Sequence, residues 1–244
     1  MKIAGRYARQ FSRQCTQCRL TKCYVVAFGA GKKYEDIILN STFDKMAEEF
    51  DTQYRIDRAQ IIADTINKEL NLTEMTNVME FGCGTGLIIL NLLDSLQAIA
   101  LVDSSKGMLT VLKDKINKIN SNKQISIYND INSYELLIES FDCIFSSMVL
   151  HHISNIPKYC NRFFQLIKQN GFLCVIDLSP VDKMFHKNEI DFTGYNGFNS
   201  KDLSIEIQKY GFIELVNKEI YSNSKIIEDK KIKYSLFMLI LQKI

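Results

Sequence analysis

The stretch Val78-Met79-Glu80-Phe81-Gly82-Cys83-Gly84-Thr85-Gly86 decides the fold prediction. Its first four residues are typical of a short buried strand, and helical spacing of apolar residues resumes from Leu87 to Leu96. The three glycines let the backbone turn tightly and bring its N–H groups close to a ligand, because no Cβ atom stands in the way. Strand, glycine loop and helix in this order predict the first βα unit of a nucleotide-binding domain.

Strand and helix patterns alternate on both sides of this unit. Apolar residues stand at helical spacing over 43–50 and 56–70. Alternation of this kind predicts an α/β fold whose mostly parallel sheet is covered by helices on both faces. The last two strands lack a helix between them, so one of them should be antiparallel. Downstream of the glycine loop we predict strands at 98–102, 124–128, 141–146, 172–178, 212–221 and 233–241, and helices at 105–119 (capped by Ser104 or Ser105), 133–138, 155–168 and 200–210.

Three acidic residues follow the first three strands of this predicted sheet. Glu80 lies two residues before the first glycine, Asp103 ends the second strand and Asp130 ends the third. The carboxyl ends of parallel strands meet at one crevice, where Asp103 can accept hydrogen bonds from ribose hydroxyls and Asp130 from an adenine amino group. An acidic loop suits a ligand with an ammonium and a sulfonium, whereas a dinucleotide fingerprint needs a third glycine where Leu87 stands. The pattern therefore indicates S-adenosyl-L-methionine (SAM) and disfavours NAD.

Four segments resemble, in order, the motifs of class I SAM-dependent methyltransferases. They are residues 78–86, 102–108 (Val-Asp-Ser-Ser-Lys-Gly-Met), 129–131 (Asn-Asp-Ile) and 141–153 (Phe-Asp-Cys-Ile-Phe-Ser-Ser-Met-Val-Leu-His-His-Ile). The resemblance extends from residue 43 to the C-terminus, and it is closest to the broad small-molecule group that includes ubiquinone and menaquinone biosynthesis methyltransferases. It implies a Rossmann-like fold with a seven-stranded sheet of order 3-2-1-4-5-7-6, in a methyltransferase domain over residues 41–244.

The resemblance also implies which residues bind SAM. The residues around the glycine loop would hold its methionine part and Asp103 its ribose. The adenine would lie against Ser104 and Met108 on one side and against residues 130–131 on the other. Ser146 and Ser147 would line the mouth through which the methyl group is transferred. The complete implied cofactor site is Glu80, Gly82, Cys83, Gly84, Asp103, Ser104, Met108, Asp130, Ile131 and Ser146.

The residues after the fourth strand narrow the class of molecule that could accept the methyl group. Methyltransferases that act on amino groups of nucleic-acid bases carry an Asn/Asp-Pro-Pro-aromatic motif there, and this chain has Ser146-Ser147-Met148-Val149. The cytosine-C5 type needs Pro-Cys, and neither Pro157 nor Pro180 precedes a cysteine. The resemblance therefore implies transfer of a methyl group to a small-molecule acceptor whose identity and methylated atom stay open. The alternative is a non-catalytic protein that keeps the fold and binds SAM or a partner.

His151 and His152 follow the fourth strand and raise the question of a general base. A histidine with an ordinary pKa near 6.5 can take a proton from a hydroxyl or an amine. Methyl transfer from a sulfonium often needs only proximity and alignment, so the use of a base stays open. We expect His151 to face the cleft as the candidate catalytic residue and His152 to order the loop. The segment 180–199 is interpreted either as a packed lid or as the substrate pocket, through Phe185, His186, Phe192, Tyr195 and Phe198.

Composition limits which partners and locations are plausible for the protein. The chain has 244 residues, 46% of them apolar, with 30 Lys and Arg against 28 Asp and Glu. Its first 33 residues hold eight of the basic residues and no acid, so the rest is mildly acidic and gives no general electrostatic case for binding nucleic acid. The longest apolar runs are too short to span a membrane. Several of the seven cysteines lie in apolar stretches, which indicates a reducing, cytoplasmic location.

Residues 1–40 lack sustained periodicity and are interpreted as a basic N-terminal appendage, expected to be disordered. Within it, Cys15-Thr-Gln-Cys18-Arg-Leu-Thr-Lys-Cys23 resembles the closing piece of the second zinc module of nuclear-receptor DNA-binding domains. The upstream cysteines of such a module are absent, and a closed zinc site needs four ligands, so we expect no metal site. A targeting peptide is another alternative, because Ile3, Tyr7 and Phe11 stand at helical spacing in acid-free sequence. The oligomeric state stays open.

Overall fold

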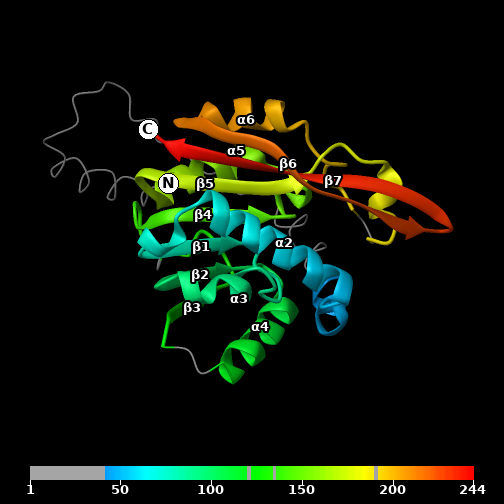
Figure 1. Ribbon diagram of the computed structural model, residues 1–244, viewed down its shortest axis with the longest axis horizontal. Coiled ribbons are helices and arrows are strands. Elements are labelled where there is room, and N and C mark those ends of the chain that lie inside the picture. The colour runs from blue at the N-terminus through cyan, green and yellow to red at the C-terminus, as the bar shows by residue number, and fades with distance from the viewer. Residues whose placement is uncertain (1–41, 120–121, 134–135, 190–191) are drawn as a thin grey trace, which may run out of the picture. The chain divides into compact units, whose positions relative to one another are not determined.

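Seven strands form one sheet in the computed structural model, which describes residues 42–119, 122–133, 136–189 and 192–244. The strand order is β3-β2-β1-β4-β5-β7-β6 (Figure 1). β7 is antiparallel to both β5 and β6, and the other neighbouring pairs are parallel, which confirms the predicted topology. The strands are β1 Asn77–Phe81, β2 Ala98–Val102, β3 Gln124–Tyr128, β4 Phe141–Ser147, β5 Ile167–Leu178, β6 Phe212–Ile227 and β7 Lys230–Lys243.

Helices cover the sheet and begin at residues that cap them. Residues 42–46 are helical and run into a 3₁₀ turn at Ala47–Glu49. The side chains before the longer helices accept hydrogen bonds from backbone N–H groups of the first turn, which a helix otherwise leaves unpaired. Of the two serines predicted to cap α4, Ser105 does so. The helices and their caps are α2 Gln53–Glu69 (Thr52), α4 Lys106–Lys118 (Ser105), α5 Ile156–Leu166 (Asn155) and α6 Ser200–Gln208 (Asn199), with the short α3 at Ile89–Leu92.

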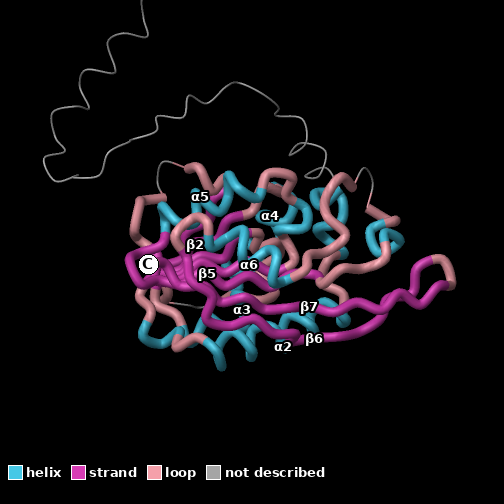
Figure 2. The backbone as a smooth tube through the Cα atoms, turned by 90° about the horizontal axis from the view of Figure 1, so that it is seen from above, coloured by secondary structure: helices cyan, strands magenta, loops and turns pink. Residues whose placement is uncertain are grey.

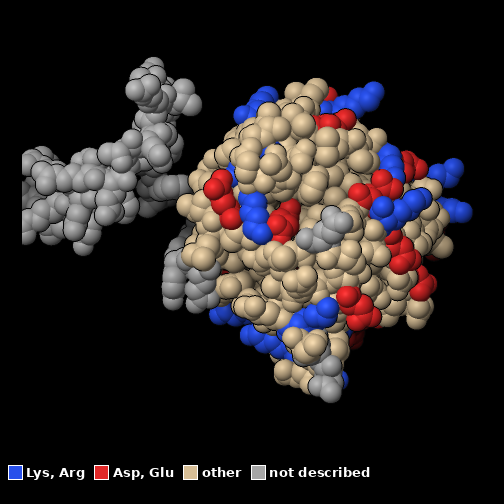
Figure 3. All heavy atoms as spheres, turned by 60° about the vertical axis from the view of Figure 1, so that its left-hand side comes forward, with Lys and Arg blue, Asp and Glu red and all other residues tan. Residues whose placement is uncertain are grey.

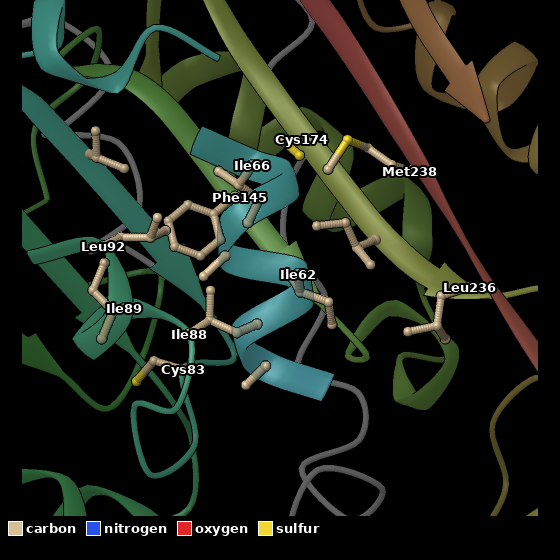
Figure 4. Close-up of a cluster of buried hydrophobic side chains, with 14 of the residues drawn as sticks. Ile62, Ile66, Cys83, Ile88, Ile89, Leu92, Phe145, Cys174, Leu236 and Met238 are labelled. Atoms are coloured by element: carbon tan, nitrogen blue, oxygen red, sulfur yellow. The ribbon is translucent and has the colours of Figure 1, made fainter. Parts of the chain in front are cut away.

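The two faces of the sheet bury two separate hydrophobic cores, because side chains alternate along each strand. On one face, Cys143 and Phe145 of β4 lie in a cluster with Ile62 and Ile66 of α2 (Figure 4). On the other face, Ile144 lies in a cluster with side chains of α5 and α6. Figure 2 shows α2 on one side of the strands and α5 on the other. Full burial of each such side chain stabilises the fold by about 1.5 to 3 kcal/mol, so both helical layers are part of the core.

The predicted helix at 133–138 is wrong. The described residues on either side of positions 134–135 form turns and bends. Leu136 is buried in the core, but Leu137 and Ile138 are 66% and 67% exposed, so among the described residues of this segment only one apolar side chain packs against the sheet. A helix of that length is unstable in water without more packing of that kind.

The predicted lengths of several elements also change. The helix expected at 87–96 is only the short α3, followed by a 3₁₀ turn at Leu93–Ser95. β6 and β7 are longer than expected and meet at Glu228 and Asp229, whose φ angles are 46° and 61°. Such angles belong to the two-residue turn that joins twisted antiparallel strands. Figures 1 and 2 show this hairpin reaching beyond the rest of the sheet. In that part the two strands are held together by backbone hydrogen bonds, although their side chains lack the alternation of apolar and polar residues that predicts a strand.

The structure also bears on the interpretations made for the rest of the chain. Within its described part, no helix is both long and apolar enough to cross a membrane. The appendage predicted at 1–40 and its cysteine motif lie outside the described residues. Those interpretations therefore stay predictions.

Candidate functional site

A cavity of about 580 Å³ opens where β1, β2, β3 and β4 end, the position at which open α/β sheets bind ligands. Ser146, one of the ten residues predicted to bind SAM, does not line it. Ser146 is buried and follows the β4 alternation toward the α5 and α6 face, whereas Ser147 lines the cavity, so the prediction for Ser146 is wrong. The other nine predicted residues all line the cavity: Glu80, Gly82, Cys83, Gly84, Asp103, Ser104, Met108, Asp130 and Ile131.

Positive φ angles at Gly82, Gly84 and Gly86, of 76°, 51° and 82°, shape the loop after β1. At Gly82 a Cβ atom would lie 2.1 Å from Cγ2 of Val149, so a larger residue would displace that side chain. At Gly84 nothing lies within 4 Å of such an atom, and the residue lines the cavity. The loop therefore presents bare backbone to a ligand in the cavity.

Asp103 ties the glycine loop to the start of α4. Its Oδ2 accepts a hydrogen bond from the N–H of Gly84 at 2.7 Å, and its Oδ1 accepts one from the N–H of Ser105 at 2.8 Å. Burial raises the pKa of the Asp103 carboxyl, and the two backbone hydrogen bonds oppose that rise. The carboxylate that was expected to serve a ligand therefore also holds the backbone of the site in place.

One oxygen of the Glu80 carboxylate has no hydrogen-bond partner in the described part of the protein. The Glu80 side chain is 2% exposed, and its Oε2 is the oxygen in question. Burial raises the pKa of Glu80 well above its usual range, Asp103 raises it further, and a hydrogen bond from the backbone of Ile89 opposes both. A buried acceptor without a partner costs about 1 to 3 kcal/mol. The residue therefore fits a ligand that brings a cationic amine, as SAM does.

The structure reverses the expected placement of the two histidines. His151 is 1% exposed, does not line the cavity, and has its Nδ1 2.5 Å from Oδ1 of Asp177. His152 lines the cavity beside Phe43, with ring centroids 5.3 Å apart. Both histidines belong to the 3₁₀ turn Leu150–His152, where consecutive side chains point about 120° apart, so they cannot both face the cleft. The expectation that His151 faces the cleft is wrong.

Aromatic rings surround His152 and hold it neutral. Its ring centroid lies 5.5 Å from that of Phe192 and 5.9 Å from that of His186. Burial, with smaller contributions from the neighbouring His151 and His186, lowers the pKa of His152 to about 2. All three histidines of the chain thus meet in one cluster. Among the described residues, no three His, Cys, Asp or Glu side chains are arranged to hold a metal ion.

The segment 180–199 packs around the histidines and does not reach the cavity wall. The His186 ring stacks on Phe192 with centroids 3.8 Å apart, and its Nδ1 lies 2.9 Å from Oε1 of Glu189. The N–H of Tyr195 donates to the carbonyl of His151 at 2.7 Å. None of the described residues of this segment lines the cavity. The described part of the segment therefore favours the packed lid, and the substrate-pocket interpretation stays a prediction.

Two acidic residues without a predicted role hold the 43–51 segment against the site. Oδ1 of Asp44 accepts a hydrogen bond from Oγ of Ser105 at 2.6 Å. Oδ1 of Asp51 accepts one from Oγ1 of Thr85 at 2.5 Å. These contacts join residues 61 and 34 positions apart, so no local pattern could reveal them. They place two aromatic side chains of the segment in the cavity wall, Phe43 and Phe50.

Two arginines of α2 also line the cavity, and the sequence analysis missed both. Arg55 donates a hydrogen bond to the carbonyl of Phe50 at 2.9 Å, and its guanidinium carbon lies 4.3 Å from the centroid of that ring. The guanidinium carbon of Arg58 lies 5.6 Å from the Tyr54 ring centroid. Their i,i+3 spacing on an amphipathic helix was the signal that the two side chains share a face.

Comparisons with known proteins agree with this geometry. Residues 79–175 match the sequence profile of a family described as a methyltransferase domain. An uncharacterized methyltransferase of Schizosaccharomyces pombe is 34% identical over 119 residues, 46% of this chain and 42% of that protein, so the match spans less than half of that relative. An uncharacterized methyltransferase of Bacillus mycoides is 26% identical over 189 residues, 75% of this chain and 84% of the other.

Solved structures show the same fold. The crystal structure of a SAM-dependent methyltransferase from Aquifex aeolicus superposes with a TM-score of 0.63 at 16% identity, covering 82% of this chain and 98% of that one. The sequence matches and the shared fold agree with the observed strand order and with a cavity built on the glycine loop. Residues 79–175 therefore carry a methyltransferase domain, and the chain shares its fold with SAM-dependent methyltransferases.

Proposed function

We propose that the chain is an enzyme that transfers a methyl group from SAM to a small-molecule acceptor. The observation that carries the proposal is the buried, half-satisfied carboxylate of Glu80 in a cavity that the glycine loop lines. A relic that had lost its ligand would keep the fold without keeping this destabilising group. The cavity of about 580 Å³ has the size of a small-molecule site.

The protein groups around the cavity divide between cofactor and acceptor. Glu80 would accept a hydrogen bond from the ammonium of the methionine part, and the backbone of Gly82 and Gly84 would approach it closely. Asp103 would bind the ribose with the carboxylate lone pairs that Gly84 and Ser105 leave free. Asp130 and the buried Ile131 would meet the edge and the face of the adenine.

The acceptor side is lined by Phe43, Phe50, Met148 and His152. When bound, SAM supplies an electrophilic methyl group on a sulfonium. The apolar side chains would exclude water and hold the acceptor in line, which is most of what this chemistry asks of a protein. His152, whose pKa burial lowers to about 2, is too weak a base to take a proton at neutral pH, so its neutral ring would serve as part of the acceptor wall. His151, fixed by Asp177, would position its neighbour.

Surface charge supports a small molecule over nucleic acid. On the face drawn in Figure 3, Lys and Arg side chains lie among Asp and Glu side chains and form no broad basic surface. Neutralising phosphates requires a concentration of positive charge, which this face does not offer. We also propose a reducing, cytoplasmic location, because four buried cysteines of the described chain are unpaired: Cys83, Cys143, Cys160 and Cys174.

Calorimetry and label transfer test the proposal together. We expect heat of binding from SAM and from its demethylated product, and none from NAD. With SAM labelled in its methyl group, we expect a component of a small-metabolite extract to become labelled. Tight binding of NAD with no heat of binding from SAM would contradict the proposed use of SAM. SAM binding without transfer to any extract component would instead favour the non-catalytic alternative.

A further inference from the structure

The charged residues of the cavity include an acidic group and a basic group, and Lys158 of α5 lines it as well. The acidic end consists of Glu80, which lies near the end of β1, and of Asp103 and Asp130, which come after β2 and β3. The basic end consists of Arg55 and Arg58, which reach the cavity from α2. α2 contacts β6, which lies at the far edge of the sheet from β3. The acidic end meets the needs of the cofactor and leaves the basic end without an assigned ligand.

The two arginines form an uncompensated positive charge. Within the described residues, neither guanidinium forms an ion pair with a carboxylate. Burial lowers the pKa of Arg55, and Arg58 lowers it further, so the two cations act on each other. Lys225 of β6 adds a third cation, since its pKa is lowered by burial and then by both arginines. Charges taken out of water are retained where a partner compensates them.

Two carboxylates, Glu189 and Asp51, lie near this group but do not neutralise it. Glu189 is close enough to raise the pKa of Arg55 and of Lys225. Its Oε1, however, lies 2.9 Å from Nδ1 of His186, and its Oε2 lies 3.7 Å from Nδ1 of His152. Asp51 also raises the pKa of Arg55, but it forms an ion pair with Lys115. Two carboxylates that are both shared with other groups leave the three cations with excess positive charge. An anion entering the cavity would remove that excess.

Two sources could supply the anion, the carboxylate of SAM and the acceptor. Arg58 favours the acceptor, because the groups that raise its pKa against the effect of burial are Tyr54 and Tyr221. Tyr221 belongs to β6, on the other side of β4, β5 and β7 from the glycine loop on β1. Arg55, by contrast, is held against Phe50 next to Asp51 and stays available to the cofactor.

Resting on the proposed function, we infer that the methyl acceptor is a small organic anion whose carboxylate or similar group binds Arg58. A planar guanidinium matches a carboxylate through two parallel hydrogen bonds. The surrounding wall is apolar, with Phe50, Ala59 and Ile62 beside the arginine. The acceptor therefore combines an apolar body with an acidic group, and Arg58 determines that specificity.

A pair of isosteric probes tests the inference without any need for turnover. The full-length protein, loaded with the demethylated cofactor to fill the cofactor site, is titrated with benzoate and with neutral benzamide by calorimetry. We expect benzoate to bind at least tenfold more tightly than benzamide. Arg58→Gln should reduce that ratio to below threefold. Lys68→Gln, which removes an exposed cation of the same helix, should leave the ratio unchanged.

Three results would overturn the inference. Equal binding of the two probes, or binding of neither, would show that the basic end does not recognise an anion. Loss of SAM affinity in Arg58→Gln, with the affinity for decarboxylated SAM unchanged, would assign the arginine to the cofactor. Unchanged benzoate preference in Arg58→Gln would place the anion elsewhere. A benzoate preference that depends on Arg58, in a protein that labels no extract component, would contradict the proposed methyl transfer and leave the anion site standing.

Discussion

At the scale of single residues, the neutral state of His152 couples stability to pH. Its pKa is lowered to about 2 in the folded protein, and its ordinary value is 6.5. Below about pH 6.5 the unfolded chain therefore binds a proton that the folded chain does not, and stability falls as pH falls, by up to about 1.4 kcal/mol per pH unit. We predict that His152→Gln loses less free energy of unfolding between pH 7 and pH 5 than the parent protein, as measured by urea titration.

The parent protein is the control for this comparison. Glu80 acts in the opposite direction, because its raised pKa makes the folded chain hold a proton that the unfolded chain has released above its ordinary pKa of 4.5. That contribution is common to both proteins, so the difference between their slopes isolates His152. Identical slopes would contradict the burial-induced pKa shift.

The carboxylate of Glu80 should lower the stability of the free protein and strengthen its binding of SAM. Since its folded pKa is raised, the stability associated with the protonated carboxyl is lost as pH rises above about 4.5. Glu80→Gln removes that loss, so we predict a variant more stable than the parent at pH 8 by at least about 1 kcal/mol. The same change should weaken SAM binding by about 1 to 3 kcal/mol, because the amide no longer offers a charged acceptor. Urea unfolding without ligand and calorimetry with SAM measure the two effects.

The exposed Glu48 provides the matched control for Glu80. Glu48→Gln should change neither quantity, since surface substitutions stay within about 0.5 kcal/mol. A Glu80→Gln variant that is less stable than the parent at pH 8 would mean that the carboxylate supports the fold and not the ligand.

At the scale of elements, substitutions at different glycines of the loop should affect different properties, either the stability of the fold or the affinity for SAM. An alanine in the left-handed region costs about 1 to 2 kcal/mol at either Gly82 or Gly84. At Gly82 the added Cβ also meets Val149 at 2.1 Å, so we predict a larger loss of stability, about 2 to 4 kcal/mol in total. At Gly84 the added atom meets no protein atom, so the strain is the whole folding cost and the main effect should be weaker SAM binding.

Urea unfolding and SAM calorimetry of the two alanine variants decide between these effects. The expected pattern is a strongly destabilised Gly82→Ala and a folded Gly84→Ala with impaired binding. If Gly84→Ala binds SAM as the parent does, the cofactor does not approach the loop at that residue.

At the scale of the whole molecule, we expect residues 1–40 to add little to the stability of the described fold. Every helix and strand that the structure describes begins at residue 42 or later. We predict that deleting residues 1–40 leaves the melting temperature and the SAM affinity nearly unchanged. Deletion through residue 72 should unfold the protein, because it removes α2 with the buried Ile62 and Ile66.

Thermal melts and calorimetry of the two truncated proteins test this difference. Unfolding of the shorter truncation would make the N-terminal segment part of the fold. Release of stoichiometric zinc on removing it would make the cysteine motif a metal site.

The alternation of strands and helices could be predicted from the sequence because its signals are local, and the resemblance to a known family supplied the strand order and the cofactor-site residues. The glycine loop and Asp103 directly follow strands with a recognisable apolar pattern, and Asp130 comes two residues after another. Parallel strands joined by helices bring such positions to one edge of the sheet whatever the details of packing. The sequence by itself therefore determined the fold class, and nine of the ten residues predicted to bind SAM line the cavity.

Only the tertiary structure decided which of two adjacent residues faces the cavity. Ser147 and not Ser146, and His152 and not His151, line it, because pleat and turn geometry assign neighbouring side chains to different faces. Contacts across many residues were equally hidden, among them the hydrogen bond from Ser105 to Asp44, 61 positions away. The position of Arg58 in the cavity depends on how α2 docks on the sheet. Orientation and long-range pairing are set by packing, and packing leaves no local trace in the chain.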